Sequence, residues 1–336
     1  MIPLSVLDLA PIVEGSNAAE ALKNSLELAQ HAEELGYRRY WVAEHHNMDG
    51  VASSATSVLI GYLAAGTKTI RVGSGGVMLP NHAPLVIAEQ FGTLTTLYPG
   101  RIDLGLGRAP GTDQMTMRAL RRTLATQTED DFIGDVIELG EYFKPPPDQR
   151  RPANPVRAIP GIGCDVPIWL LGSSLYSAQV SAHLGLPFAF ASHFAPAMLM
   201  QAVEIYRARF KPNGQPGALT QPHAMVAVNV VVADTDDEAN YLFTSLQQRF
   251  LGMQTGKRGP LPKPISVAEM NALGSQSERA GMDQMLAVTA VGSPATVRAK
   301  LDAIIAQTHA DELIIAGAVH DHTARLRSYE LLAGIN

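Results

Sequence analysis

The sequence predicts an α/β protein, a (β/α)8 TIM barrel with loop insertions. Apolar runs recur along the chain, amphipathic stretches separate them, and the runs number eight. Runs that are apolar throughout are typical of parallel strands buried on both faces, and their alternation with helices indicates a parallel sheet. Eight such strands favour a closed barrel over an open sheet. The expected strands are residues 4–9, 40–43, 70–79, 102–106, 167–171, 188–191, 224–232 and 313–316.

The helices expected between these strands carry local start signals. In residues 18–35 apolar side chains repeat on one face, and Asn17 with Glu20 has the spacing of a capping-box variant. Ser293 followed by Pro294 reads as an N-cap with proline in the first turn, which opens a helix through residue 305. The other expected helices are residues 54–65, 84–97, 174–184, 197–210 and 236–250.

Two stretches break the rhythm of strands and helices. The chain of 336 residues exceeds the roughly 250 of a lone barrel but is short for two large domains, so we expect residues 1–336 to form one domain. The interruptions, at about 144–166 and 252–277, have the proline-rich or glycine-rich composition of loops. Insertions in a barrel often line the active-site mouth, so both are candidate lids, although solvent-exposed excursions would look the same.

Composition narrows the functional classes. With 46% hydrophobic and 17% charged residues the chain can bury a sizeable core, and its net charge of -6 argues against a nucleic-acid or anionic-membrane surface. A single cysteine, Cys164, allows neither an internal disulfide nor a thiolate-rich metal site. There is no signal-peptide pattern at the N-terminus and no long apolar run, so we expect a cytoplasmic protein with no membrane segment.

Glu44, His45 and His46 follow the second expected strand. The carboxyl end of a barrel strand faces the catalytic side, where histidines can act as acid, base or hydrogen-bond donor near neutral pH. The same residues could be an ordinary polar strand end or a pair of metal ligands, but a zinc site needs a third ligand and the spaced motif is absent.

The third strand ends in a glycine-rich segment that contains Ser74, Gly75 and Gly76. Glycines at a strand end let a flat ligand approach the backbone closely. The spacing does not match the dinucleotide fingerprint, in which glycines open a helix directly after a strand, so the sequence does not predict a Rossmann site.

Arg108, Arg118 and the pair Ser173-Ser174 are candidates for binding a phosphate. Guanidinium groups offer charge-assisted bidentate hydrogen bonds, and a helix that starts beside Ser174 adds unpaired N–H groups. Taken alone, Arg118 could be a solvated helix residue and either serine an ordinary N-cap. The combination of the two arginines with the helix start indicates an anion site.

Taken together and in order, four segments resemble the bacterial luciferase family. They are AEHH (43–46), GSGGVMLP (73–80), GRIDLGLGR (100–108) and PGTDQMTMRAL (110–120), and residues 172–174 and 291–294 also fit. The resemblance implies a barrel that binds FMN at the carboxyl ends of its strands. It further implies that a separate flavin reductase supplies reduced FMN, which reacts with dioxygen to give a C4a-peroxyflavin that oxidises a small organic substrate.

The resemblance also implies roles for individual residues. His45 stands at the catalytic histidine position, with Glu44 and His46 as neighbours that orient it. The family's non-proline cis peptide beneath the flavin ring matches Gly75-Gly76. The positions implied on the cofactor side are Ser74, Gly75, Gly76, Gly107, Arg108, Arg118, Gly172, Ser173, Ser174 and Tyr176, with Ser177 as an alternative to Tyr176.

Two departures and three alternatives complete the prediction. Gly107 replaces the reactive cysteine of the luciferases and Ser192 a tryptophan, so we expect a non-luminescent relative. The family commonly dimerises through helices near the second and third strands, which predicts a homodimer through residues 54–65 or an ordinary barrel-facing helix there. The alternatives are a deazaflavin-dependent oxidoreductase, a non-catalytic flavin-binding protein, and a metal-dependent hydrolase that would use His45, His46, His82 and Asp103.

Overall fold

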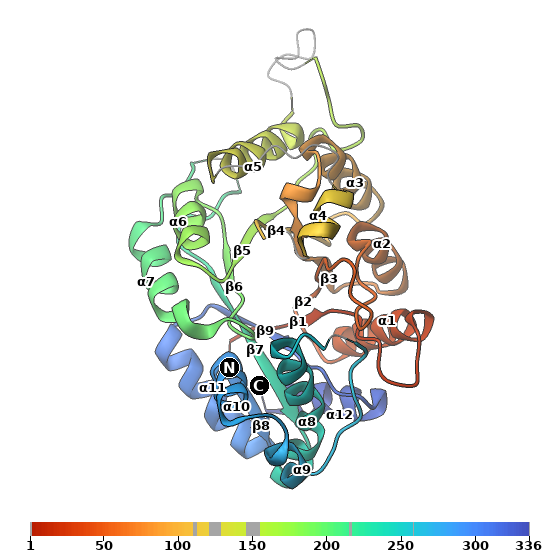
Figure 1. The fold of residues 1–336 in the computed structure, drawn as a ribbon. Helices are drawn as coiled ribbons and strands as arrows, with labels where there is room; N and C mark the ends of the chain where they lie inside the picture. Colours follow the sequence, from red (N-terminus) through yellow and green to blue (C-terminus); the bar gives the residue numbers. More distant parts are fainter. Residues whose placement is uncertain are drawn as a thin grey trace.

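A closed barrel of eight parallel strands lies at the centre of the molecule, with helices around it (Figure 1). The structure is a computed structural model that describes residues 2–109, 113–120, 129–145, 155–214, 217–257 and 259–335. Around the barrel the order is β1-β2-β3-β4-β5-β6-β7-β9, and β9 pairs with β1 to close the ring. The predicted (β/α)8 barrel is therefore confirmed. The barrel strands are β1 (Leu4–Asp8), β2 (Arg39–Val42), β3 (Arg71–Met78), β4 (Ile102–Gly107), β5 (Ile168–Gly172), β6 (Phe188–Phe190), β7 (Ala224–Val232) and β9 (Glu312–Ala316).

One further strand, β8 (Thr289–Gly292), was not predicted from the sequence. It pairs with the last four residues of β7, whereas the preceding part of β7 pairs with β9 in the barrel. A fully buried strand of nine residues is long enough to serve both partners. β8 therefore extends the sheet outside the ring without changing its closure.

The surrounding helices begin where the local signals predicted. Asn17 caps α1, since its side chain accepts a hydrogen bond from the Glu20 N–H at 3.1 Å, and Ser293 with Pro294 begins α11. The described helices are α1 (Ala18–Glu34), α2 (Thr56–Gly66), α3 (Pro84–Leu97), α4 (Gln114–Leu120), α5 (Glu129–Phe143), α6 (Leu175–Leu184), α7 (Leu199–Arg209), α8 (Asp236–Gln254), α9 (Val267–Ala272), α10 (Gln276–Met285), α11 (Pro294–Thr308) and α12 (His322–Gly334), with 3-10 turns η1 (Leu79–Asn81) and η2 (Pro196–Met198).

The stretch 252–277 is not the uniform loop that its composition suggested. It contains α9 and the start of α10, and each of these helices begins with a complete capping box, Ser266 with Glu269 and Ser275 with Glu278. These helix-start signals are present in the sequence, but the prediction for this stretch considered only its glycine and proline content. In the other interrupted stretch, residues 146–154 lie outside the described part of the chain.

Backbone hydrogen bonds attach the stretch 252–277 to loops at the carboxyl end of the barrel. Leu261 exchanges hydrogen bonds with the loop after β1, donating to the Ile12 carbonyl at 2.8 Å and accepting from the Glu14 N–H at 2.9 Å. The Ile12 N–H donates in turn to the carbonyl of Gly50, in the loop after β2. Three segments that are distant in sequence therefore meet at this end of the barrel.

The middle of the barrel is filled by a layer of apolar side chains. Successive residues of a strand point to opposite faces, so alternate positions of each strand face inward. Trp41 and Trp169 meet edge to face there, with ring centroids 5.1 Å apart. The buried members of the layer are Leu7, Trp41, Ala43, Trp169, Ala189, Met225, Ala227 and Ile314. This layer separates the two ends of the barrel.

At the amino end of the barrel, buried charges are paired. The Arg39 guanidinium donates to Asp103 at 2.7 Å and to Glu312 at 3.0 Å, and Arg71 donates to the other oxygen of Asp103 at 2.6 Å. Burial raises the pKa of Glu312, but hydrogen bonds and the charge of Arg39 outweigh it, so its pKa lies below the ordinary value. Glu312 therefore stays ionised at neutral pH.

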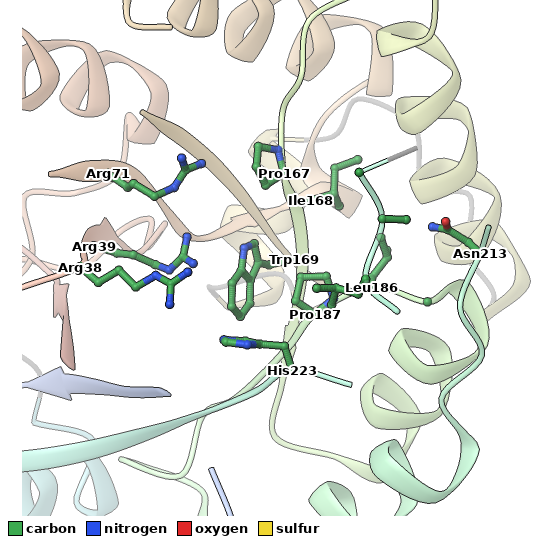
Figure 2. Close-up of a pocket in the computed structure, with 14 residues that line it drawn as sticks. Arg38, Arg39, Arg71, Pro167, Ile168, Trp169, Leu186, Pro187, Asn213 and His223 are labelled. Atoms are coloured by element: carbon green, nitrogen blue, oxygen red, sulfur yellow. The ribbon is translucent and has the colours of Figure 1, made fainter. Parts of the chain in front are cut away.

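A cavity of about 320 Å³ opens beside this network (Figure 2). Arg38, Arg39 and Arg71 enter it from one side, and Trp169 and His223 lie opposite. All come from the first residues of strands or from the turns before them. The cavity therefore lies at the end of the barrel opposite the one where barrel enzymes carry their active sites.

Candidate active site

Glu44 follows β2 and fastens the end of that strand to the segment after β3. Its buried carboxylate accepts hydrogen bonds from the Met78 N–H at 3.0 Å, from His46 at 2.8 Å and from His82 at 3.0 Å. Burial raises the pKa of this carboxyl, but the hydrogen bonds and charge of His82, followed by His46 and Met78, lower it more. Both oxygens of the Glu44 carboxylate therefore already accept hydrogen bonds from the protein.

His45 lies next to this cluster without joining it. Its Nδ1 atom is buried and has no hydrogen-bond partner in the described part of the chain. Burial, followed by the charge of Arg249, lowers the pKa of His45 to about 4, so the imidazole is neutral at pH 7. The Glu44 carboxylate accepts from His46, His82 and the Met78 N–H, and the orienting role of Glu44 and His46 toward His45 stays a prediction.

His193 and Arg249 lie close to His45, and the sequence reading missed both. The Nδ1 atom of His193 is also buried without a partner in the described chain, and burial, with the charge of His45, lowers its pKa to about 4. The Arg249 Nη2 donates to the Gly50 carbonyl at 3.3 Å. His193 comes shortly after β6, so the strand-end rule that selected His45 applies to it. Arg249 lies within α8, where no local signal marks it.

The glycine-rich end of β3 runs very close to β4. The Gly75-Gly76 peptide bond is cis, as the resemblance implies. A Cβ on Gly76 would lie 2.7 Å from the Gly105 carbonyl oxygen, so contact between the strands alone requires glycine there. The Ser74 hydroxyl donates to the Gly105 carbonyl and accepts from its N–H, both at 2.9 Å. Ser74 therefore has little hydrogen-bonding capacity left for a ligand.

Arg108 and Tyr176 come together at the carboxyl ends of β4 and β5. The Arg108 guanidinium lies 4.3 Å from the centroid of the Tyr176 ring, and Tyr176 belongs to the first turn of α6. Ser174 is the N-cap of this helix but makes no side-chain capping bond, which leaves its hydroxyl and the first N–H groups facing outward from the helix start. Ser173 precedes it and is half-buried.

Three more of the residues that the resemblance implies on the cofactor side are Gly107, Gly172 and Arg118. A Cβ on Gly172 would lie 2.2 Å from the Ser177 Oγ, so packing of α6 on β5 explains this glycine. A Cβ on Gly107 would meet the flexible end of Met78 at 2.9 Å. Arg118 is exposed on α4 and makes no hydrogen bond or ion pair with any described residue, while residues 110–112 and 121–128 on either side of α4 lie outside the description.

The residues at this end of the barrel fit a flavin mononucleotide. A helix start beside an arginine suits its phosphate, and the buried Nδ1 atoms of His45 and His193 are polar atoms that the described chain leaves without partners. The metal alternative has no such fit, since Asp103 belongs to the network at the opposite end. The described residues contain no group of three potential metal ligands and no helix long and apolar enough to cross a membrane.

Known proteins match this chain over its length. A family model described as luciferase-like monooxygenase matches residues 2–312. A luciferase-like monooxygenase of Escherichia coli K12 is 58% identical over 98% of this chain and 96% of its own. An N-acetyl-S-alkylcysteine monooxygenase of Bacillus subtilis is 41% identical over 77% and 76%. The crystal structure of apo-MsnO8 superposes with a TM-score of 0.89 at 38% identity, over 100% of this chain and 98% of the other. The chain therefore belongs to the luciferase-like monooxygenase family.

Proposed function

We propose that the protein is a two-component monooxygenase that uses reduced FMN and dioxygen to oxidise a small organic substrate. Membership of the family supports the reaction class. The observation that carries the choice of FMN is the stacking of Arg108 on Tyr176 at the start of α6, which forms a place for a terminal phosphate.

The phosphate would lie against the first turn of α6, with Ser173, Ser174 and Arg108 as donors and Arg118 free to join them. The flavin ring would lie over the backbone of Gly75 and Gly76, and bound reduced FMN supplies the electrons that activate dioxygen for transfer of one oxygen atom. The remaining steps fall to side chains that bind the substrate and control protons.

His45 would serve as a neutral hydrogen-bonding group. With a pKa near 4 it carries almost no charge at pH 7, so it acts by offering or receiving a hydrogen bond rather than as an imidazolium acid. Its surroundings are desolvated, which strengthens each hydrogen bond that it makes to a reacting oxygen. This role requires that His45 stay unpaired with Glu44, as the structure has it.

The phosphate site is tested by comparing reduced FMN with reduced riboflavin in anaerobic titrations. Wild type should bind FMN at least tenfold more tightly, because only FMN offers charge-assisted hydrogen bonds to Arg108 and the helix start. Arg108→Met should remove most of that preference, and the exposed Arg298→Gln should keep it. Equal binding of FMN and riboflavin by wild type would contradict the phosphate site, and binding of neither would redirect attention to a deazaflavin.

The reductase requirement is tested with the isolated protein. Supplied with a reduced nicotinamide cofactor and FMN, it should not reduce the flavin, whereas addition of a flavin reductase should start oxygen consumption. Rapid flavin reduction by the isolated protein would contradict a two-component system. N-acetyl-S-alkylcysteines, which the name of the Bacillus subtilis relative gives as that enzyme's substrates, are the first compounds to test for oxidation.

We propose a homodimer through α2 and α3. Val58 and Tyr62 of α2 and Val86 and Leu97 of α3 are exposed apolar side chains on neighbouring helices, while Leu59 and Leu63 face the barrel. Light scattering should give the mass of a dimer for wild type and of a monomer for Val58→Asp combined with Tyr62→Lys. A monomeric wild type would contradict the proposal.

A further inference from the structure

Arg249 is a partly buried cation without a counter-ion. It extends from α8 toward the loop after β2, and its hydrogen bond to the Gly50 carbonyl is the only one it makes with the described residues. No aspartate or glutamate in the described chain lies within ion-pair distance of it. Taking a guanidinium out of water without an anion is unfavourable, so such an arginine is typical of a site that an anion completes.

The two histidines beside Arg249 carry no charge that could replace this anion, and the Glu44 carboxylate next to His45 already accepts from His46, His82 and the Met78 N–H. His45 is close enough for the arginine to lower its pKa, and both His45 and His193 are neutral at pH 7. Each of these histidines has a buried Nδ1 without a partner in the described chain. One positive charge and two buried Nδ1 atoms without partners in the described chain therefore lie near one another at the barrel mouth.

This cationic site lies across the mouth from the proposed phosphate site. In the ring of strands, β5 and β1 are four positions apart, and α6 begins directly after β5. Arg249 spans from α8, which follows β7, to the loop after β2, and these two strands flank β9 and β1. Figure 1 shows α8 and α6 on opposite sides of the barrel. A flavin phosphate at α6 would leave Arg249 without its anion.

We infer that Arg249 binds a carboxylate of the organic substrate, at the barrel mouth beside His45 and His193. The inference rests on the proposed monooxygenase function and specifies its substrate class as small organic monoanions. A planar guanidinium matches a carboxylate in bidentate geometry, and a single arginine balances one negative charge. His45 and His193 would then donate to or accept from the neutral part of the same molecule.

Calorimetric binding without turnover tests the inference. The probes are N-acetyl-S-methylcysteine and its carboxamide, which differ in charge but hardly in shape. Wild type should bind the carboxylate more than about tenfold tighter than the amide. Arg249→Met should reduce this preference below about threefold, Arg249→Lys should keep part of it, and the surface variant Arg298→Gln should keep all of it. Circular dichroism checks that each variant is folded.

Three results would overturn the inference: equal affinity of wild type for the two probes, no binding of the carboxylate, or an unchanged preference in Arg249→Met. If Arg249→Met instead weakens binding of reduced FMN, the arginine serves the cofactor. Failure of wild type to bind any flavin would sink the proposed function but would leave the carboxylate preference, measured without flavin, as an independent result.

Discussion

The two ends of the barrel differ in whether their buried polar groups have partners. At the amino end, Arg39 bridges Asp103 and Glu312, Arg71 completes the pairing of Asp103, and Ser5 donates to Glu312. At the carboxyl end, His45 and His193 have buried ring nitrogens without partners in the described chain, and Arg249 has no carboxylate there.

The difference separates a structural site from a functional one. Buried polar groups in folded proteins are normally satisfied, so an unsatisfied set at the catalytic end of a barrel indicates where a ligand supplies the missing partners. The cavity at the amino end is well formed, yet its buried cations already have anions (Figure 2). Completeness of pairing is therefore a better guide to function here than the presence of a hollow.

The largest expected effect is on turnover at the carboxyl end. If His45 has the proposed role, His45→Ala should lower the rate of substrate oxidation about 10²- to 10³-fold while the protein keeps its fold, because the variant loses the hydrogen bond to the reacting oxygen. The rate of formation of oxidised substrate, with a flavin reductase supplying reduced FMN, measures this, and the exposed His183→Ala provides the matched control. Comparable rates in the two variants would remove His45 from the catalytic machinery.

At the amino end we expect a loss of stability without a loss of turnover. Asp103→Ala should cost about 3–5 kcal/mol of unfolding free energy, because it leaves the buried Arg39 and the half-buried Arg71 with less negative charge than they require. Turnover per folded molecule should be unchanged. Urea denaturation compares it with Asp302→Ala, whose exposed pair with Arg298 should contribute no more than about 0.5 kcal/mol. Similar losses in both variants would contradict the structural role of the network.

A pH effect follows from the two neutral histidines. Their pKa falls from 6.5 when unfolded to about 4 when folded, so the unfolded chain binds more protons between these values and stability is lost as pH falls through this window. Each histidine should contribute up to about 1.4 kcal/mol per pH unit. The carboxyl groups of Glu44 and Glu312, whose pKa values are lowered, reduce the stability only as the pH falls below about 4.5.

Urea denaturation at pH 7.5, 6.0 and 5.0 measures this slope. The double variant His45→Gln, His193→Gln should show a clearly smaller loss of stability between the highest and the lowest of these pH values than wild type. His322, whose pKa is also lowered, remains in both proteins and does not affect the comparison. Parallel slopes in wild type and the double variant would mean that the two imidazoles are not held neutral.

The sequence predicted the barrel because its strands are long enough, apolar enough and regularly separated. It put forward His45 and Arg108 as site candidates because both follow strands that are easy to recognise. It missed β8 because Thr289 and Gly292 leave only two apolar residues in that strand, and it missed Arg249 because a polar residue within an amphipathic helix looks like a solvated one. The conflict between a buried arginine and the absence of a counter-ion appears only when the chain is folded.

The orienting role of Glu44 and His46 toward His45 stays a prediction, and it shows what sequence order alone leaves open. Adjacent residues on a strand end point in different directions, so neighbours in sequence need not bond to one another. Glu44 instead meets His82, which is distant in the chain, and the cluster holds η1 in place. The rule that polar residues at strand ends are site candidates does not tell which of these side chains share hydrogen bonds.

The smallest expected effect concerns the rim of the amino-end cavity. Arg38 is exposed and lies 3.9 Å from Glu312, a carboxylate that Arg39 and Ser5 already satisfy, so Arg38→Gln should change the unfolding free energy by no more than about 1 kcal/mol.

The same variant probes whether the cavity holds an anion. Added inorganic phosphate should raise the melting temperature of wild type and Arg38→Gln equally, because the buried cations behind the rim are already paired. A stabilisation by phosphate that disappears in Arg38→Gln would show an anion site at this end and remove the contrast between the two ends.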